Sequence, residues 1–101
     1  MPEISVLMGI YQGNRDYAAQ AIDSVLNQTY EDYEFMICDD GSDQDFFRWL
    51  EKYCRKDSRI RLLHNQKNEG LASALNKCIA CSSGRYLARM DADDISEKTR
   101  F

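Results

Sequence analysis

The feature that most constrains the fold is a regular alternation of short apolar runs with longer segments of helical periodicity. Apolar runs at residues 4–8, 34–38, 60–63 and 86–90 alternate with helical segments near 15–27, 43–54 and 70–83. Strands of about five residues that alternate with helices of about thirteen predict a three-layer βαβαβαβ arrangement with a parallel sheet and right-handed crossovers. We therefore expect a single α/β domain over residues 1–101.

The boundaries of these segments carry further signals. Ser42 or Asp43 can cap the second helix, and Gly84 is well placed to end the third. The third strand alternates least cleanly, as expected at the edge of a sheet. The third helix is expected to bury one apolar face. That face consists of Leu71, Ala72, Leu75, Cys78 and Ile79.

Charge and composition exclude several classes of protein. The net charge of −4 and the pI of about 4.9 argue against a nucleic-acid partner, because binding to a phosphate backbone needs clustered cations. No apolar run approaches the roughly 20 residues of a membrane span, and no signal-peptide pattern opens the chain, so we expect a cytoplasmic protein. Cys78 and Cys81 have C-x-x-C spacing, but His64 is the single histidine and a second cysteine pair is missing. We therefore expect these cysteines to serve in packing.

Polar and acidic side chains follow three of the four apolar runs. In open parallel sheets, ligands bind at the carboxyl ends of the strands, near the point where the strand order reverses. Carboxylates gathered at one edge repel one another, and a bound cation is the economical explanation for them. The residues are Tyr11 and Gln12 after the first run, Asp39 and Asp40 after the second, and Asp91, Asp93 and Asp94 after the fourth.

The spacing of Asp91 and Asp93 favours a metal site. In an extended or tightly turned backbone the two carboxylates can point to the same side, and Ala92 leaves room between them. Mg²⁺ or Mn²⁺ takes carboxylate oxygens and keeps positions open for phosphate oxygens. Such a metal would neutralise a diphosphate leaving group. The alternative is an acidic turn with local capping hydrogen bonds.

Two common nucleotide-binding motifs are missing. The sequence contains neither G-x-x-x-x-G-K-[ST] nor G-x-G-x-x-G, and Gly9 and Gly13 are too far apart to start the second. A dinucleotide-dependent oxidoreductase or a P-loop enzyme is therefore not expected.

Five sequence blocks, in order and at the right intervals, carry a resemblance to a known family. The chain resembles the amino-terminal half of the family 2 glycosyltransferases, which have the GT-A fold of nucleotide-diphospho-sugar transferases, and the resemblance covers all 101 residues. It implies the sheet order 3-2-1-4. The blocks are residues 4–11, 21–30, 38–42, 68–76 and 88–94.

The resemblance also implies roles for single residues. Gly9 and Tyr11 would line the nucleotide pocket, with the tyrosine ring against the base, and Asp40 would accept a hydrogen bond from uracil. Asp91 and Asp93 would form the D-x-D motif, with Asp93 the direct ligand of Mn²⁺ or Mg²⁺ and Asp91 nearer the ribose and a metal-bound water. From the residues themselves we expect Asp39 to brace the turn that follows it rather than to contact a ligand.

The implied reaction is inverting transfer of a sugar from a nucleoside diphosphate, expected to be UDP, to an unknown acceptor in bacterial surface-polysaccharide synthesis. The general base would lie beyond Phe101, so these residues would bind donor and metal without catalysing transfer. The full-length enzyme could be peripheral at the inner face of the membrane, and the fragment could form a homodimer through an uncovered sheet edge. Three departures from the family pattern are Gly9 for proline, Gln12 for asparagine and Lys98 for proline.

Two other functions fit a small nucleotide-binding sheet. A nucleotidyltransferase usually has a loop rich in glycine and in lysine or arginine after its first strand, and residues 9–14 contain no lysine. A phospho-acceptor signalling domain with a Mg²⁺ pocket needs an aspartate at the end of its third strand, where this sequence has Leu63, His64 and Asn65.

Overall fold

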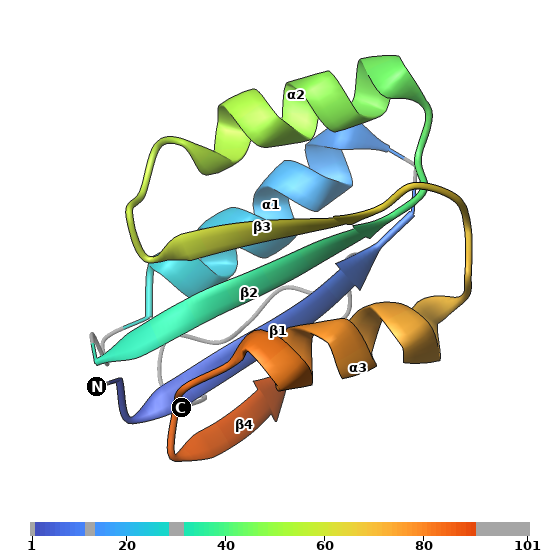
Figure 1. Ribbon diagram of the computed structural model, residues 1–101. Helices are drawn as coiled ribbons and strands as arrows, with labels where there is room; N and C mark the ends of the chain where they lie inside the picture. The colour runs from blue at the N-terminus through green and yellow to red at the C-terminus, as the bar shows by residue number, and fades with distance from the viewer. Residues whose placement is uncertain (1, 12–13, 29–31, 91–101) are drawn as a thin grey trace.

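The computed structural model describes residues 2–11, 14–28 and 32–90, and over this range the chain alternates strand and helix as the sequence predicts (Figure 1). The predictions for Asp91, Asp93, Asp94, Gln12 and Lys98 concern residues outside the described ranges. The elements are β1 (Ile4–Ile10), α1 (Arg15–Leu26), β2 (Tyr33–Asp40), α2 (Gln44–Cys54), β3 (Ile60–Asn65), α3 (Leu71–Cys81) and β4 (Tyr86–Arg89).

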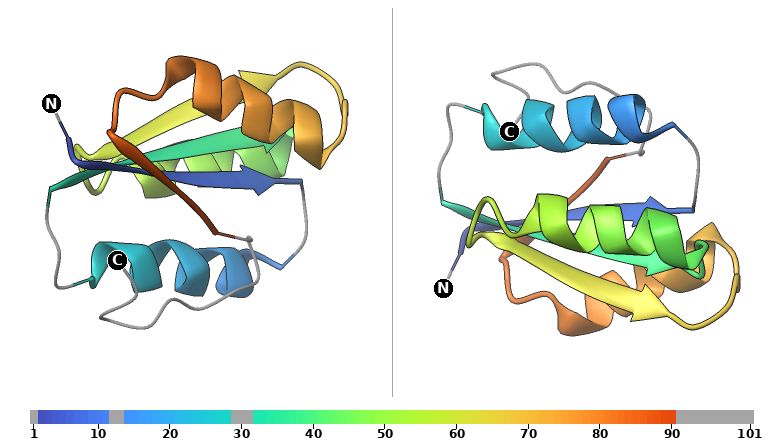
Figure 2. Two further views of the ribbon diagram at one scale, coloured as in Figure 1. Left: turned by 90° about the horizontal axis from the view of Figure 1, so that it is seen from below. Right: turned by 90° about the horizontal axis from the view of Figure 1, so that it is seen from above.

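The four strands form one parallel sheet in the order β3-β2-β1-β4, which confirms the expected topology. Helices α1 and α3 lie on opposite sides of the sheet (Figure 2). The central strands β1 and β2 are buried almost throughout, whereas the residues of β3 and β4 are mostly half-buried or exposed. This difference follows from topology, because β3 and β4 are the two edges.

The core has two parts, one on each face of the sheet. The larger part lies under α1 and α2, where Phe35 and Ile37 of β2 meet Ile22 of α1 and Leu50 of α2. The smaller part lies under α3, where Ala74 and Cys78 pack on Leu7, Met36 and Cys38. Small side chains on α3 bring this helix close to the sheet.

The face that α3 buries agrees with the predicted one at Cys78 and at the half-buried Leu75 and differs from it elsewhere. Ala74 and Cys78 are fully buried, but Leu71 is 45% exposed and Ile79 is 44% exposed. The prediction placed Ala72 in the buried face as well, and it is exposed. Close approach of the helix selects the small residues for the contact, and the larger apolar side chains are left on its flank.

Two further predictions about α3 need correction. The helix ends at Cys81 with Ser82 as its C-cap, and Gly84 comes later with no positive φ. A β-carbon on Gly84 would overlap Ser5, so the glycine is needed for close approach of the chain to β1. Cys78 is a buried packing cysteine as expected, but Cys81 is exposed. None of the described helices has both the length and the apolar character of a membrane span.

Candidate functional site

The carboxyl ends of β1, β2 and β3 meet at one edge of the sheet. The strand register pairs Ile10 with Asp39, and Asp40 with Asn65. Tyr11 follows β1 at this edge and is 50% exposed, so its ring is available to a ligand. The structure therefore brings Tyr11, Asp39 and Asp40 to the same edge, as predicted from the sequence.

Asp40 is the last residue of β2, and its carboxylate is almost completely buried at 2% exposure. Oδ1 accepts hydrogen bonds from Asn65 Nδ2 at 2.9 Å and from the Glu69 amide at 3.0 Å. Oδ2 accepts from Asn68 Nδ2 at 3.1 Å and from the Gly70 amide at 2.8 Å. Burial alone would raise the pKa of Asp40, but the hydrogen bonds from Asn65, Glu69 and Gly70 outweigh it and lower the pKa below its usual value.

Asp39 points into a different environment from Asp40. It is fully buried, and its Oδ2 accepts a hydrogen bond from the Ser42 amide at 3.1 Å and lies 3.6 Å from His64 Nε2. The prediction that Asp39 braces the following turn is therefore confirmed. Its Oδ1 has no hydrogen-bond partner within the part of the chain that the structure describes.

Helices α1, α2 and α3 all begin at this edge. A side chain caps the first turn of α1 and of α2, and no side chain caps α3. Asn14 accepts from the amides of Asp16 and Tyr17 at the start of α1, and Asp43 accepts from the Phe46 amide at the start of α2. Of the two predicted caps for α2, Asp43 is the one used. The N-cap of α3 is Gly70, which supplies no side chain.

Gly9 lies beneath the first turns of α3. A β-carbon at this position would lie 2.6 Å from Leu71 Cδ1 and 3.3 Å from Ala74 Cβ. The missing side chain lets α3 approach β1, which gives Gly9 a packing role. Its predicted role in lining the nucleotide pocket stays a prediction.

Sequence reasoning missed the residues that hold Asp40. Asn65 and Asn68 contact it from positions 25 and 28 residues later in the chain. The available signal was weak, since it consists of an asparagine at the end of the third strand and an Asn-Glu-Gly sequence before the third helix. The hydrogen bond predicted from the base to Asp40 stays a prediction, and in this structure the chain itself supplies four donors to that carboxylate.

These contacts change the electrostatic argument for a metal. Asp40 is stabilised by four N–H donors, so it does not need a cation to be tolerated. Asp39 accepts one hydrogen bond, from the Ser42 amide. Across residues 2–11, 14–28 and 32–90, no cluster of three or more metal-ligating side chains occurs. The case for a metal therefore rests on Asp91 and Asp93. β4 runs beside β1, and the amide of Met90, the last residue before them that the structure describes, donates to Leu7 O at 2.8 Å.

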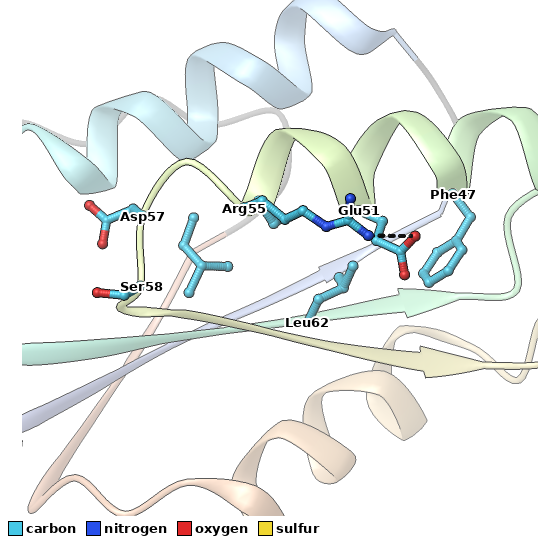
Figure 3. A pocket seen from close by; sticks show the side chains of 8 residues that line it. Phe47, Glu51, Arg55, Asp57, Ser58 and Leu62 are labelled. Carbon is cyan, nitrogen blue, oxygen red and sulfur yellow. Dashed lines mark ion pairs between the residues drawn. The ribbon is translucent and has the colours of Figure 1, made fainter.

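Two hollows on the surface lie away from these residues. One of about 300 Å³ lies between α2 and β3 and contains the ion pair of Glu51 with Arg55 at 3.6 Å (Figure 3). Another of about 410 Å³ is lined by α2 side chains that include Trp49 and Tyr53. Neither contains a residue predicted for the site.

Comparison with known families gives a match over most of the chain. Residues 5–101 match the family model described as Glycosyl transferase family 2. EpsE of Bacillus subtilis is 42% identical over 101 residues, which are 99% of this chain and 36% of that protein. Chondroitin synthase of Escherichia coli is 36% identical over 97 residues, which are 96% of this chain and 14% of that protein. The chain thus spans about a third or less of the length of these relatives.

Solved structures match the fold. The Staphylococcus aureus protein TarS, as its residues 1–349, superimposes with a TM-score of 0.83 at 22% identity, over 95% of this chain and 29% of that one. TarS has also been solved with UDP-GlcNAc. The mannosyltransferase PcManGT from Pyrobaculum calidifontis, solved with GDP-Man and Mn²⁺, gives a TM-score of 0.82 at 19% identity, over 93% of this chain and 28% of that one. At these identities the likeness establishes the GT-A fold.

Proposed function

The chain belongs to glycosyltransferase family 2, and from this premise we propose that it forms the donor-binding part of a glycosyltransferase, with a nucleoside-diphosphate sugar as its ligand. The observation that carries the proposal is the sheet order β3-β2-β1-β4. The chain moves from β1 to β3 in one direction and places β4 on the other side of β1, so the strand order reverses beside β1. A crevice for a nucleotide forms at such a point, outside the carboxyl ends of the strands.

The proposed donor is a UDP-sugar, and the base stacks on Tyr11. The half-exposed ring at the end of β1 supports this, because an aromatic face is a sequence-tolerant platform for a base. TarS, with the same fold, has been solved with UDP and with UDP-GlcNAc. Gly9 and Asp40 belong to the same site in this proposal.

The proposed metal is Mn²⁺ or Mg²⁺, held by Asp93 and Asp91. Carboxylates at this spacing suit a hard divalent ion, and the same-fold mannosyltransferase was solved with Mn²⁺. When bound, the ion would neutralise the negative charge of the diphosphate leaving group. The residues of β1 and β2 at this edge would orient the nucleotide.

We further propose that the complete enzyme inverts the sugar configuration and acts in bacterial cell-surface polysaccharide synthesis, at the cytoplasmic side. Chondroitin synthase, a relative by sequence, supports a polysaccharide product. The general base and the acceptor contacts are assigned to regions beyond Phe101, so these 101 residues would bind donor without transferring sugar. A nucleotidyltransferase and a phospho-acceptor domain are not favoured, because the family match covers residues 5–101.

Calorimetric titration with UDP in the presence of Mn²⁺ tests the donor site. We expect saturable binding that EDTA weakens, and a loss of about tenfold or more in affinity for Tyr11→Ala, since stacking on one base contributes roughly 1–3 kcal/mol. Tyr86→Ala is the matched control, because Tyr86 is an exposed tyrosine at the start of β4, at the opposite edge of the sheet. Absence of any heat at millimolar UDP, from a sample that is folded by circular dichroism, would refute the proposal.

A further inference from the structure

A hollow of about 410 Å³ lies along the second half of α2, away from the edge that carries Tyr11. Its volume falls within the range of small-molecule sites, about 300–1,000 Å³. Helix α1 lies beside α2 on the same side of the sheet (Figure 1), and its residues Arg15 and Asp23 contact this part of α2. The residues that line the hollow are three or four positions apart and so share one helix face. They are Trp49, Lys52, Tyr53 and Lys56.

The aromatic rings of the hollow form a fixed wall. The rings of Trp49 and Tyr53 stack with their centroids 5.3 Å apart and 29° between their planes. The Tyr53 hydroxyl donates to both carboxylate oxygens of Asp23 at 2.7 Å. Lys56 Nζ lies 4.3 Å from the Tyr53 ring centroid and 2.6 Å from Asp23 Oδ1. Contacts with α1 therefore hold this wall in place without a ligand, which lowers the cost of binding one.

Two cations beside this wall have no acidic partner. Lys52 is exposed, and within the described residues its ammonium group makes no ion pair. The same holds for Arg15, whose guanidinium lies 5.9 Å from the Trp49 ring centroid, near the outer limit of about 6 Å for a cation–π contact. Lys56, by contrast, is paired with Asp23. The hollow thus has an unneutralised positive charge, although the whole chain has a net charge of −4.

Shape and charge together select the kind of ligand. Trp and Tyr supply large, rigid contact area at low entropic cost, and the C–H face of a sugar ring packs on such a surface. Unpaired cations attract carboxylates. A membrane surface fits less well, because insertion into lipid needs protruding apolar side chains. None of the large apolar side chains exposed in the described part of the chain lies on α2.

We propose that this hollow binds an acidic saccharide, a sugar chain with carboxylate groups, at a site separate from the donor site. A sugar ring packs against Trp49 in place of the loosely held Arg15, and Lys52 and Arg15 pair with its carboxylate. This inference rests on the proposed function, since its ligand is a saccharide. It deepens that function by adding a surface that holds a sugar chain away from the donor.

Tryptophan fluorescence reports on this site directly, because Trp49 is the single tryptophan of the chain. Titration with hexagalacturonate should give a saturable change in emission. Maltohexaose, of equal length but without carboxylates, should bind about tenfold or more weakly. Added NaCl should also weaken hexagalacturonate, since exposed charges farther apart than about 10 Å are screened at 0.1 M salt.

Two results of this titration would overturn the proposal. One is the absence of a saturable change at millimolar hexagalacturonate in a sample that is folded by circular dichroism. The other is equal binding of hexaglutamate, an acidic peptide, or of phosphatidylglycerol vesicles, because charge without a sugar ring would then be sufficient.

A charge reversal in the hollow has a matched control on the other side of the sheet. Lys52→Glu should weaken hexagalacturonate by about tenfold or more and leave the affinity for UDP with Mn²⁺ unchanged. Lys77→Glu makes the same change in charge at an exposed position of α3, across the sheet (Figure 2), and should keep the wild-type affinity. Equal losses in both variants would overturn the proposal, since only the net charge of the protein would matter.

The two ligands separate failure of this site from failure of the donor function. Binding of UDP without binding of hexagalacturonate by the wild-type chain would refute the saccharide site alone. Binding of hexagalacturonate without binding of UDP would refute the donor function and support the saccharide site.

Discussion

The two ends of β2 hold the two ends of α3 by the same chemistry. At the carboxyl end, Asp40 accepts from the Gly70 amide just before α3. At the amino end, Glu34 accepts from the Ser83 amide at 2.5 Å and the Gly84 amide at 3.2 Å, just after α3. Each carboxylate is buried, with Asp40 2% exposed and Glu34 8% exposed. One central strand therefore fixes the crossover helix at both ends.

The two ends differ in what surrounds the carboxylate. Glu34 also accepts from Ser5 Oγ at 2.6 Å, and Arg61 lies 3.7 Å away, so its partners belong to strands and to the loop that enters β4. Asp40 is held by one stretch, residues 65–70, at the edge where Tyr11 is exposed. The comparison teaches that a buried acidic residue at a strand end is not by itself a sign of a metal. Glu34, at the opposite edge from the proposed site, is satisfied in the same way.

The largest effect is expected from adding a methyl group beside Asp40. Gly41→Ala combines a positive φ of 77° with overlap on the backbone of Lys67 and Asn68, and we expect it to lower the free energy of unfolding by about 2–5 kcal/mol. Gly84→Ala is the counterpart at the Glu34 end. It overlaps Ser5 but has no positive φ, so its loss should be smaller. Urea denaturation followed by circular dichroism measures both.

A control separates overlap from backbone conformation. Gly70 has a φ of 102°, but a β-carbon there would meet open space. Gly70→Ala should therefore cost only the conformational strain, about 1–3 kcal/mol. A Gly41→Ala protein as stable as the wild type would show that residues 65–70 are not pressed against the end of β2.

The sequence predicted the elements and their order, because hydrophobic periodicity is a local signal. It did not predict the partners of Asp40 and Glu34, since these lie 25 to 30 residues away for Asp40 and 27 to 50 away for Glu34. The second strand was also predicted too short, ending at residue 38, whereas β2 ends at Asp40. Asp39 and Asp40 read as a loop by polarity, but both are the buried last residues of β2. A polar residue can be buried when hydrogen-bond donors from distant parts of the chain reach it, and the local sequence pattern does not reveal those donors.

The buried face of α3 was predicted only in part, for a related reason. Apolar periodicity correctly selected Cys78 and the half-buried Leu75, but it also selected Leu71, Ala72 and Ile79, which are exposed, and it left out the fully buried Ala74. The choice depends on how closely the helix can approach Gly9, which is a property of another strand. The distance between α3 and β1 therefore determines which residues of the helix are buried, and periodicity alone does not contain this distance.

A moderate effect is expected when either carboxylate is neutralised. For both Asp40 and Glu34, burial raises the pKa, but hydrogen bonds from the neighbouring donors outweigh it and leave the pKa below its usual value. A folded-state pKa below the unfolded value means that the stabilisation is complete above the unfolded value, near pH 4 to 4.5, and is lost as the pH falls through the folded value. Asp40→Asn and Glu34→Gln should each cost about 2–3 kcal/mol at pH 7 and flatten the acid dependence below pH 4.5.

The same pair of variants sharpens the contrast in function. Glu34→Gln should lose stability and keep its affinity for UDP, measured where the protein remains folded, because Glu34 lies at the edge away from Tyr11. Asp40→Asn should lose both stability and affinity for UDP. Equal losses of nucleotide affinity in the two variants would mean that the two ends of β2 are equivalent, and the distinction drawn between them would be wrong.

The smallest loss of stability is expected at Asp23, whose carboxylate has a contact as short as those of Asp40 and Glu34 but is more exposed to solvent. Asp23 Oδ1 lies 2.6 Å from Lys56 Nζ, and both side chains are 42% exposed. Burial raises the pKa of Asp23, yet the hydrogen bonds from Lys56 and Tyr53 lower it overall. Solvent screens such a pair, so we expect Lys56→Ala to cost only about 0.2–1 kcal/mol, and less in 1 M NaCl. If Lys56→Ala were as damaging as Glu34→Gln in the same urea titration, contact distance rather than burial would set the strength of these carboxylate contacts. The contrast between exposed and buried acids would then lose its physical basis.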